Sequence, residues 1–316
     1  MTDQYSLSPI RIKQVEKGAE KGYASAQCHL ALMYEYGHGV PQDYAKACEW
    51  YEKAAEQGYA KAQFKLALMY QTGQGVPQDY ARARQWYESA AAQGHAAAQF
   101  NLGWMYGTGH GVPQDCAKAR EWYEKAAEQG DAQAQVCLAV MYEDGRGIPQ
   151  DFAKARQWYE RAAMQGDAAA QYSLGWFYGA GLGVSQDQAK ACEWYEKAAA
   201  QGHADAQFNL AVMYGKGRGV PQDLAKASIW YEKAAEQGNV RAQVNLAVMY
   251  ESGNGVAQDY AKAREWFERA AAQGDTVAQY NLGRMYESGL GVPQDYAKAC
   301  KWYAKAAMPT DNSASQ

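Results

Sequence analysis

Long apolar runs are missing from this chain of 316 residues, whose mean hydropathy is -0.59. A membrane-spanning helix needs about 20 consecutive apolar residues, so we expect none here. Residues 1–22, which begin Met1-Thr2-Asp3-Gln4, also lack an apolar stretch of signal-peptide length. These absences predict a cytoplasmic protein, with secretion by a route that needs no cleaved signal as the alternative.

An excess of basic residues is missing as well. The chain has 31 Lys and Arg against 35 Asp and Glu, which leaves a net charge of -4 at pH 7. Proteins that bind nucleic acid normally present a basic stripe to the phosphate backbone. We therefore expect no nucleic-acid partner, and an RNA-binding helical array is disfavoured for the same reason.

Repetition is what the sequence has instead. A glutamine in the word Ala-x-Ala-Gln, or a close variant of it, recurs every 36 residues without insertion or deletion from Tyr23 to Thr310. The recurring residues are Gln27, Gln63, Gln99, Gln135, Gln171, Gln207, Gln243 and Gln279. A fixed period of this kind predicts a stacked array in which each repeat contacts its neighbours. The eight repeats are residues 23–58, 59–94, 95–130, 131–166, 167–202, 203–238, 239–274 and 275–310.

Each repeat contains the signals of two helices. In residues 59–94, apolar residues at helical spacing from Ala60 predict a first helix, and one of two recurring glycines is expected to end it in a left-handed conformation. Asp79 is a good N-cap for a second helix that runs from Tyr80 to about Gln93. One tryptophan in every second helix, and a tyrosine in every first helix, are predicted to be core anchors rather than ligand contacts.

The six cysteines do not follow the repeat. A disulfide-stapled array would place cysteines at the same two positions in repeat after repeat. Cys48, Cys192 and Cys300 share a position but lie in repeats 1, 5 and 8. We therefore expect free thiols in a reducing compartment, although Cys28 and Cys48 belong to one repeat and could meet.

The pattern A-x-A-Q-x-x-L-x-x-M-Y-x-x-G-x-G-V-P-Q-D-Y-A-K-A-x-x-W-Y-E-K-A-A-x-Q-G resembles the Sel-one-like repeat (SLR) family, which is related to tetratricopeptide repeats. The resemblance covers residues 23–310, with departures such as Ser185 and Ala257 in place of the loop proline. It implies an all-α fold, a right-handed superhelical solenoid of helix-turn-helix repeats whose first helices line the concave side. It also implies a bacterial adaptor in signalling, protein quality control or contact with a host.

The two ends are expected to differ. Residues 1–22 are interpreted as a tail and a capping helix, because the segment from Ile10 to Gly22 is a degenerate second helix in which Gln14 replaces the tryptophan. The last repeat has no following helix to cover it, so its apolar end could self-associate. Residues 311–316 are small and polar, which predicts a disordered tail.

Some SLR proteins are described as β-lactamases, so the motifs of that reaction would point to an enzyme. Neither Ser-x-x-Lys nor Lys-Thr-Gly occurs, and both belong to that serine machinery. The five histidines form no His-x-x-x-His pair, so no metal site is expected. We expect a protein without catalysis or cofactors, and a β-lactamase-like hydrolase is the least favoured alternative.

Positions 3, 7, 10 and 14 of the repeat vary freely, and their spacing places them on one stripe of the first helix. Asparagines recur at position 7. Position 10 is mostly apolar and includes Trp104 and Trp176, the two tryptophans that lie outside the recurring tryptophan position of the second helix. Asparagine can pair with a peptide backbone, and tryptophan is a common interface anchor. The predicted partner-binding residues are Lys61, Lys65, Asn101, Trp104, Trp176, Asn209, Val212, Asn245, Val248, Asn281 and Arg284.

This stripe predicts a scaffold that holds a peptide or protein along a groove. An effector that uses the same groove on a host protein is the alternative. The competing interpretation is that these positions are solvated and drift without selection.

Overall fold

A computed structural model describes residues 9–308, and every regular element in that range is a helix. The first helices of the eight repeats, called helix A here, are α2 (Ala24–Tyr36), α4 (Ala60–Thr72), α6 (Ala96–Thr108), α8 (Ala132–Asp144), α10 (Ala168–Ala180), α12 (Ala204–Lys216), α14 (Val240–Ser252) and α16 (Thr276–Ser288). The second helices, called helix B, are α3 (Tyr44–Glu56), α5 (Tyr80–Ala92), α7 (Cys116–Glu128), α9 (Phe152–Met164), α11 (Gln188–Ala200), α13 (Leu224–Glu236), α15 (Tyr260–Ala272) and α17 (Tyr296–Ala307). The all-α repeat architecture predicted from the period is confirmed.

The helix ends follow the predicted capping chemistry. Helix α4 stops at Gly73, whose φ of 73° is left-handed and whose amide donates to the carbonyl of Met69. Helix α5 starts after Asp79, whose carboxylate accepts from the amides of Ala81 and Arg82 at 2.9 and 3.0 Å. Gly75, the second recurring glycine, also has a positive φ, and a Cβ there would lie 2.4 Å from the carbonyl oxygen of Tyr44. The A–B loop therefore packs tightly onto the preceding repeat.

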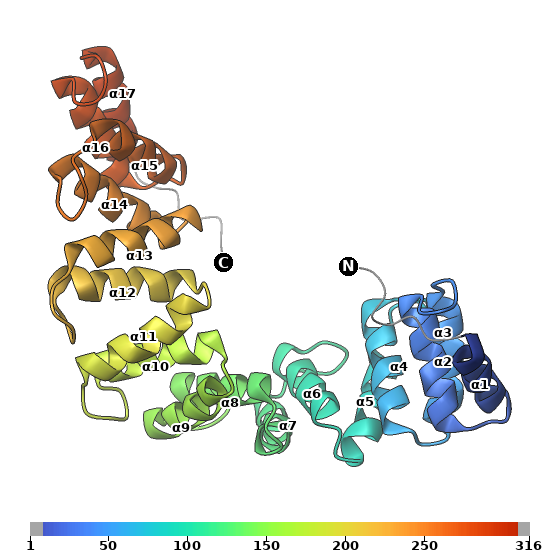
Figure 1. Cartoon of the computed structure of the whole chain (residues 1–316). Helices are drawn as coiled ribbons and strands as arrows, with labels where there is room; N and C mark the ends of the chain where they lie inside the picture. Colours follow the sequence, from blue (N-terminus) through green and yellow to red (C-terminus); the bar gives the residue numbers. More distant parts are fainter. Residues whose placement is uncertain (1–8, 309–316) are drawn as a thin grey trace. The chain divides into compact units, whose positions relative to one another are not determined.

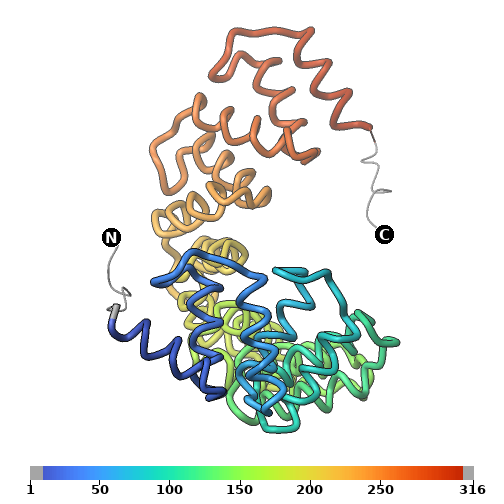
Figure 2. Tube along the Cα trace, turned by 90° about the vertical axis from the view of Figure 1, so that its right-hand side faces the viewer, coloured from blue at the N-terminus to red at the C-terminus, as the bar shows by residue number. Residues whose placement is uncertain are grey.

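The chain divides after Ala162 into two compact units, each of which is a stack of helical hairpins. Within a unit, helix A packs on helix B of its own repeat and on helix B of the repeat before it, and Figures 1 and 2 trace these successive hairpins. At the start of the first unit, α1 (Pro9–Glu20) packs on α2. The tail predicted for residues 311–316 lies outside the described residues.

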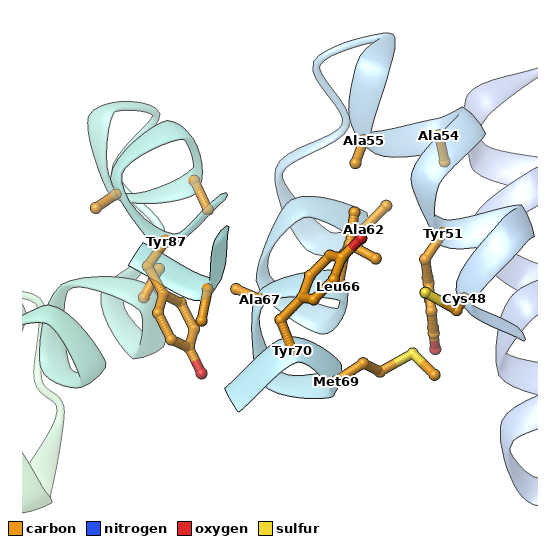
Figure 3. Close-up of a cluster of buried hydrophobic side chains, with 14 of the residues drawn as sticks. Cys48, Tyr51, Ala54, Ala55, Ala62, Leu66, Ala67, Met69, Tyr70 and Tyr87 are labelled. Atoms are coloured by element: carbon orange, nitrogen blue, oxygen red, sulfur yellow. The ribbon is translucent and has the colours of Figure 1, made fainter. Parts of the chain in front are cut away.

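The core is built mainly from alanine, with leucine, methionine and aromatic side chains between the alanines. Figure 3 shows Cys48, Tyr51 and Met69 gathered between α3 and α4. Tyr51 and Tyr87 are fully buried, as are many of the alanines around them. Small side chains allow helices to approach closely, and the ring fills the remaining space.

The tryptophan one residue before this tyrosine was predicted to be a core anchor, and that prediction overstated its burial. Trp50 is only half-buried, and the same holds for its counterparts in the other repeats except Trp266, which is buried. A cation from the next turn covers the indole, and the ammonium of Lys53 lies 4.0 Å from the ring centroid of Trp50. The buried aromatic anchor of helix B is therefore the tyrosine that follows the tryptophan, such as Tyr51 after Trp50. The tryptophan packs at the edge of the core.

The recurring glutamine joins neighbouring repeats. The amide nitrogen of Gln99 donates to the carbonyl of Ala91 in the preceding helix B at 3.2 Å. Its carbonyl oxygen accepts from the side chain of Gln129, at the end of its own repeat, at 2.7 Å. Buried polar groups must be paired, which explains why this polar residue recurs within an alanine core.

All six cysteines are free thiols, so Cys28 and Cys48 do not pair. Among the described residues, no helix is long and apolar enough to cross a membrane.

Candidate functional site

The predicted stripe lies on helix A, but its rows differ in exposure. Position 3 is mostly exposed, as at Lys61, whereas position 7 is half-buried in every repeat except at His29. Position 7 lies at the boundary with the preceding repeat. The prediction that the stripe is not needed for packing is therefore wrong for position 7.

Lys65 shows what position 7 does. Its ammonium lies 2.8 Å from a carboxylate oxygen of Glu35 and 3.0 Å from the hydroxyl of Tyr36, both on the helix A before it. The Lys65 and Glu35 side chains are both largely shielded from water. This lysine ties α2 to α4, and its charge is already compensated within the protein.

Arg284 is also compensated. Its guanidinium forms an ion pair with Glu251 of the preceding helix A. In repeats 1, 4 and 8 the acidic residue at this position accepts from the helix B tyrosine of its own repeat, for example Glu143 from Tyr159 at 2.7 Å, and in repeat 1 Glu35 accepts from Lys65 as well. Repeat 7 has Phe267 at the tyrosine position, so Glu251 has no hydroxyl donor there and takes the arginine.

The asparagines do not form a free row of peptide-binding amides. Asn209 lies within hydrogen-bonding reach of the hydroxyls of Tyr172 and Tyr195, and Asn245 reaches Tyr231 in the same way. Burial raises the pKa of Tyr195, so this hydroxyl stays protonated and polar partners must come from the protein. Asn209 and Asn245 thus lie beside tyrosine hydroxyls of the protein rather than facing open solvent.

The remaining two asparagines bond to their own helices. The side-chain amides of Asn101 and Asn281 donate to carbonyls one turn earlier, at 2.8 and 2.9 Å. A glycine at position 13 explains why Asn209 and Asn245 differ from these. Gly179 and Gly215 supply no side chain to the buried tyrosine of their repeat, so its hydroxyl turns to the next helix A.

The two tryptophans of position 10 differ in exposure. Trp104 is half-buried and covered by the imidazole of His110, which stacks on it with ring centroids 4.7 Å apart. Trp176 is 43% exposed, and the residue at the position of His110 is Leu182. Trp176 also makes an edge-on contact with Phe177, with ring centroids 5.6 Å apart. Of these two tryptophans, Trp176 is therefore the one that leaves a large part of its ring open to a partner.

Beside Trp176 lies a recess of about 280 Å³, formed by α10, α11 and α12 of the second unit. It brings three predicted residues together, namely Trp176, Asn209 and Val212. The lining also includes Gly179, Ala180, Gln188, Tyr195, Met213 and Arg218. The recess is open because small residues stand where other repeats carry glutamate, glutamine or larger polar side chains.

Among the lining residues that sequence reasoning missed, Gln188 and Arg218 carry long polar side chains. Both stand at positions that vary between repeats, so the same comparison that found the helix A stripe could have found them. They were passed over because they lie outside helix A, at the start of α11 and in the loop after α12. Further along the apolar row, Val248 of α14 is 43% exposed.

The described residues show no chemistry beyond binding. No group of three His, Cys, Asp or Glu side chains in residues 9–308 could hold a metal ion. Burial raises the pKa of Cys28, Cys48 and Cys192 to about 11, so these thiols are protonated near neutral pH.

Comparison with known proteins places the chain in a family. The Sel1 repeat family matches residues 24–59, 60–95, 96–131, 132–167, 168–203, 204–239, 240–275 and 276–308. Among solved structures, c5321, a protective antigen of uropathogenic Escherichia coli strains with an SLR fold, is 41% identical with a TM-score of 0.92. The match covers 94% of this chain and 64% of that one, so this chain spans just under two thirds of its length.

A second solved structure, a Sel1 repeat protein from Oxalobacter formigenes, is 36% identical with a TM-score of 0.72, over 94% of this chain and 86% of that one. No protein of curated function matches the chain. The repeat match and these two structures agree: this chain belongs to the Sel1 repeat family.

Proposed function

We propose that this protein is a scaffold without catalytic activity, which holds a peptide or a segment of a protein partner against the helix A face. Sel1 repeat proteins are generally scaffolds for protein interactions. The proposal gives this chain a specific contact, the open recess at Trp176.

The exposure of Trp176 is the observation that carries the proposal. The indole of Trp176 is 43% exposed beside a recess, so it lacks much of the stabilisation that burial in a core would give it. Tryptophan in such a place is typical of the residues that dominate binding energy at interfaces. Val212 belongs to the apolar lining of the recess itself, and Val248 of α14, which is 43% exposed, offers an apolar contact beyond it.

The contacts within the protein support a smaller set of binding residues than the one predicted from the sequence. Lys65, Arg284, Asn209 and Asn245 already have partners within the protein, and Asn101 and Asn281 bond to their own helices. We therefore propose that Trp176, Val212 and Val248 make the main contacts of the second unit. In the first unit, Lys61 and the edge of Trp104 remain accessible.

A second candidate is an effector that uses the same face on a host protein. It is favoured by the likeness to an antigen that is protective and present in uropathogenic strains. Fractionation of host cells exposed to producing bacteria separates the candidates, because an effector is recovered in the host cytosol and an internal scaffold is not.

The binding proposal is tested with a phage library of random dodecapeptides, selected on the folded protein and then measured by fluorescence polarisation. Trp176→Ala should abolish or strongly weaken binding of the selected peptides. The matched control is Ile229→Ala, which removes a side chain that is 52% exposed on helix B of the same unit. Peptides that bind both variants equally well would contradict the proposal.

A further inference from the structure

The recess at Trp176 has a single formal charge in its lining. Arg218 is the only ionisable cation or anion at neutral pH among the lining residues, and no Asp or Glu takes part. The guanidinium stands in the A–B loop of repeat 6, at the mouth of an otherwise largely uncharged surface. A ligand that enters the recess thus meets one positive charge.

An internal comparison shows that this charge is uncompensated. In repeat 4 the arginine at the same position, Arg146, forms an ion pair with Asp144 at 2.8 Å. In repeat 6 the position of Asp144 is taken by Lys216, which repels a guanidinium. Arg218 forms no ion pair within the described residues. The exchange of aspartate for lysine therefore leaves the charge of Arg218 free for a ligand.

The other polar groups of the recess are already engaged. The side-chain amide of Gln188 donates to the carbonyl of Gly179 at 2.9 Å. Asn209 lies within hydrogen-bonding reach of Tyr195. Because these groups serve the protein, Arg218 is the lining group best placed to select for ligand charge.

The size of the recess limits what can enter it. Its volume of about 280 Å³ is below the ~300–1,000 Å³ typical of sites for drug-sized ligands. The walls formed by Trp176, Val212 and Met213 are apolar. One aromatic or bulky aliphatic side chain fits this description, and aromatic rings pair favourably with an indole face or edge.

We infer that the recess binds a peptide in which an aromatic or bulky aliphatic residue is followed directly by an acidic one, with the apolar side chain against Trp176 and the carboxylate on Arg218. This inference rests on the proposed function, because it specifies the partner of the same recess. A guanidinium pairs well with a carboxylate in planar, bidentate geometry.

The test uses labelled hexapeptides with Phe-Asp, Phe-Asn, Phe-Lys or Ala-Asp at the centre and Gly-Ser flanks, measured by fluorescence polarisation. Phe-Asp should bind about three- to tenfold more tightly than Phe-Asn, since Arg218 is exposed and the pair is partly screened by water. Raising the salt should reduce this preference. Ala-Asp should bind weakly, because it leaves the apolar walls uncovered.

Variants of the protein then test which residues cause the preference for Phe-Asp over Phe-Asn. Arg218→Gln should remove it, and Arg218→Glu should favour Phe-Lys. Lys216→Asp should weaken it by giving Arg218 the internal partner that Arg146 has in repeat 4. Arg146→Gln is the matched control and should change nothing.

The possible failures are distinguishable. Equal binding of Phe-Asp and Phe-Asn, with both lost in Trp176→Ala, would overturn the inference and leave the proposed function standing. Absence of any Trp176-dependent binding, both for these hexapeptides and for library peptides, would overturn both.

Discussion

Glu251 of α14 and Arg284 of α16 form an ion pair that links repeats 7 and 8. The pair occurs in the one repeat in which the buried tyrosine is replaced, by Phe267. In repeats 1, 4 and 8 the tyrosine hydroxyl donates to the acidic residue at the position of Glu251. In repeat 7 a cation from the neighbouring helix thus takes the place of the missing hydroxyl, whereas in repeat 1 Glu35 accepts from both Tyr51 and Lys65.

We expect Arg284→Ala to destabilise the second unit by about 1–2 kcal/mol, because Glu251 is largely shielded and would lose its counter-charge. The loss should be smaller when Phe267→Tyr is present, since the new hydroxyl would donate to the same carboxylate. A double-mutant cycle by chemical denaturation measures this coupling. Additive effects of the two changes would contradict the proposed exchange of partners.

Removing the buried tyrosine should cost more than removing the neighbouring tryptophan. We expect Tyr87→Ala to lower the free energy of unfolding by about 3–5 kcal/mol, because the ring is fully buried. Trp86→Ala should cost only about 1–2 kcal/mol, because that indole is half-buried and Ser89 stands where other repeats place a covering cation. Circular dichroism during guanidinium denaturation compares the two, and the reverse order would refute the assignment of the core.

The sequence predicted the local structure of each repeat but not the different burial of Trp86 and Tyr87. Periodicity predicted the helix ends and the cap at Asp79 correctly, because these depend on local chemistry that recurs in each repeat. Trp86 and Tyr87 are adjacent, and both lie near the apolar stripe of α5. Their exposure is decided by how α5 leans against its neighbours, which is a tertiary property that the period of one helix does not contain.

The candidate site was predictable to a similar degree. Variation between repeats pointed to the helix A stripe and to Trp176, which does line an open recess. It did not separate Trp176 from Trp104, because the stacking of His110 on Trp104 depends on how a loop folds back. Nor did it show that Lys65 is paired, since its partner Glu35 lies 30 residues earlier in the chain.

The recurring glutamine offers a test with an internal control. Gln99 makes two hydrogen bonds that link helices, and Gln99→Leu should destabilise the first unit by about 1–2 kcal/mol. The carbonyl oxygen of Gln279 is buried without a donor, and Pro309 stands where the preceding repeats have the donating glutamine. Gln279 keeps only a longer hydrogen bond, from its side-chain amide to the carbonyl of Ala271 at 3.4 Å, so Gln279→Leu should destabilise the second unit less than Gln99→Leu destabilises the first. Equal losses of stability in the two variants would show that these hydrogen bonds contribute little.

The thiols should react in the order of their burial. Burial raises the pKa of Cys28, Cys48 and Cys192 to about 11, whereas Cys300 is exposed. At pH 8 we expect fast alkylation of Cys300 and slow alkylation of the three buried thiols, because the thiolate is the reactive form. Mass spectrometry after timed quenching identifies the sites, and unfolded protein, in which all six cysteines should react, is the control.

The same shifts imply a dependence of stability on pH. An unfolded thiol has a pKa of about 8.5, so the native state holds its protons more tightly than the unfolded state does. The stability due to these thiols is complete below that pH and is lost as the pH rises toward about 11. A triple variant with Cys28, Cys48 and Cys192 changed to Ala should lose less stability between pH 8 and 10 than the unchanged chain. Parallel curves for the two proteins would show that other groups, such as the buried tyrosines, govern the alkaline limb.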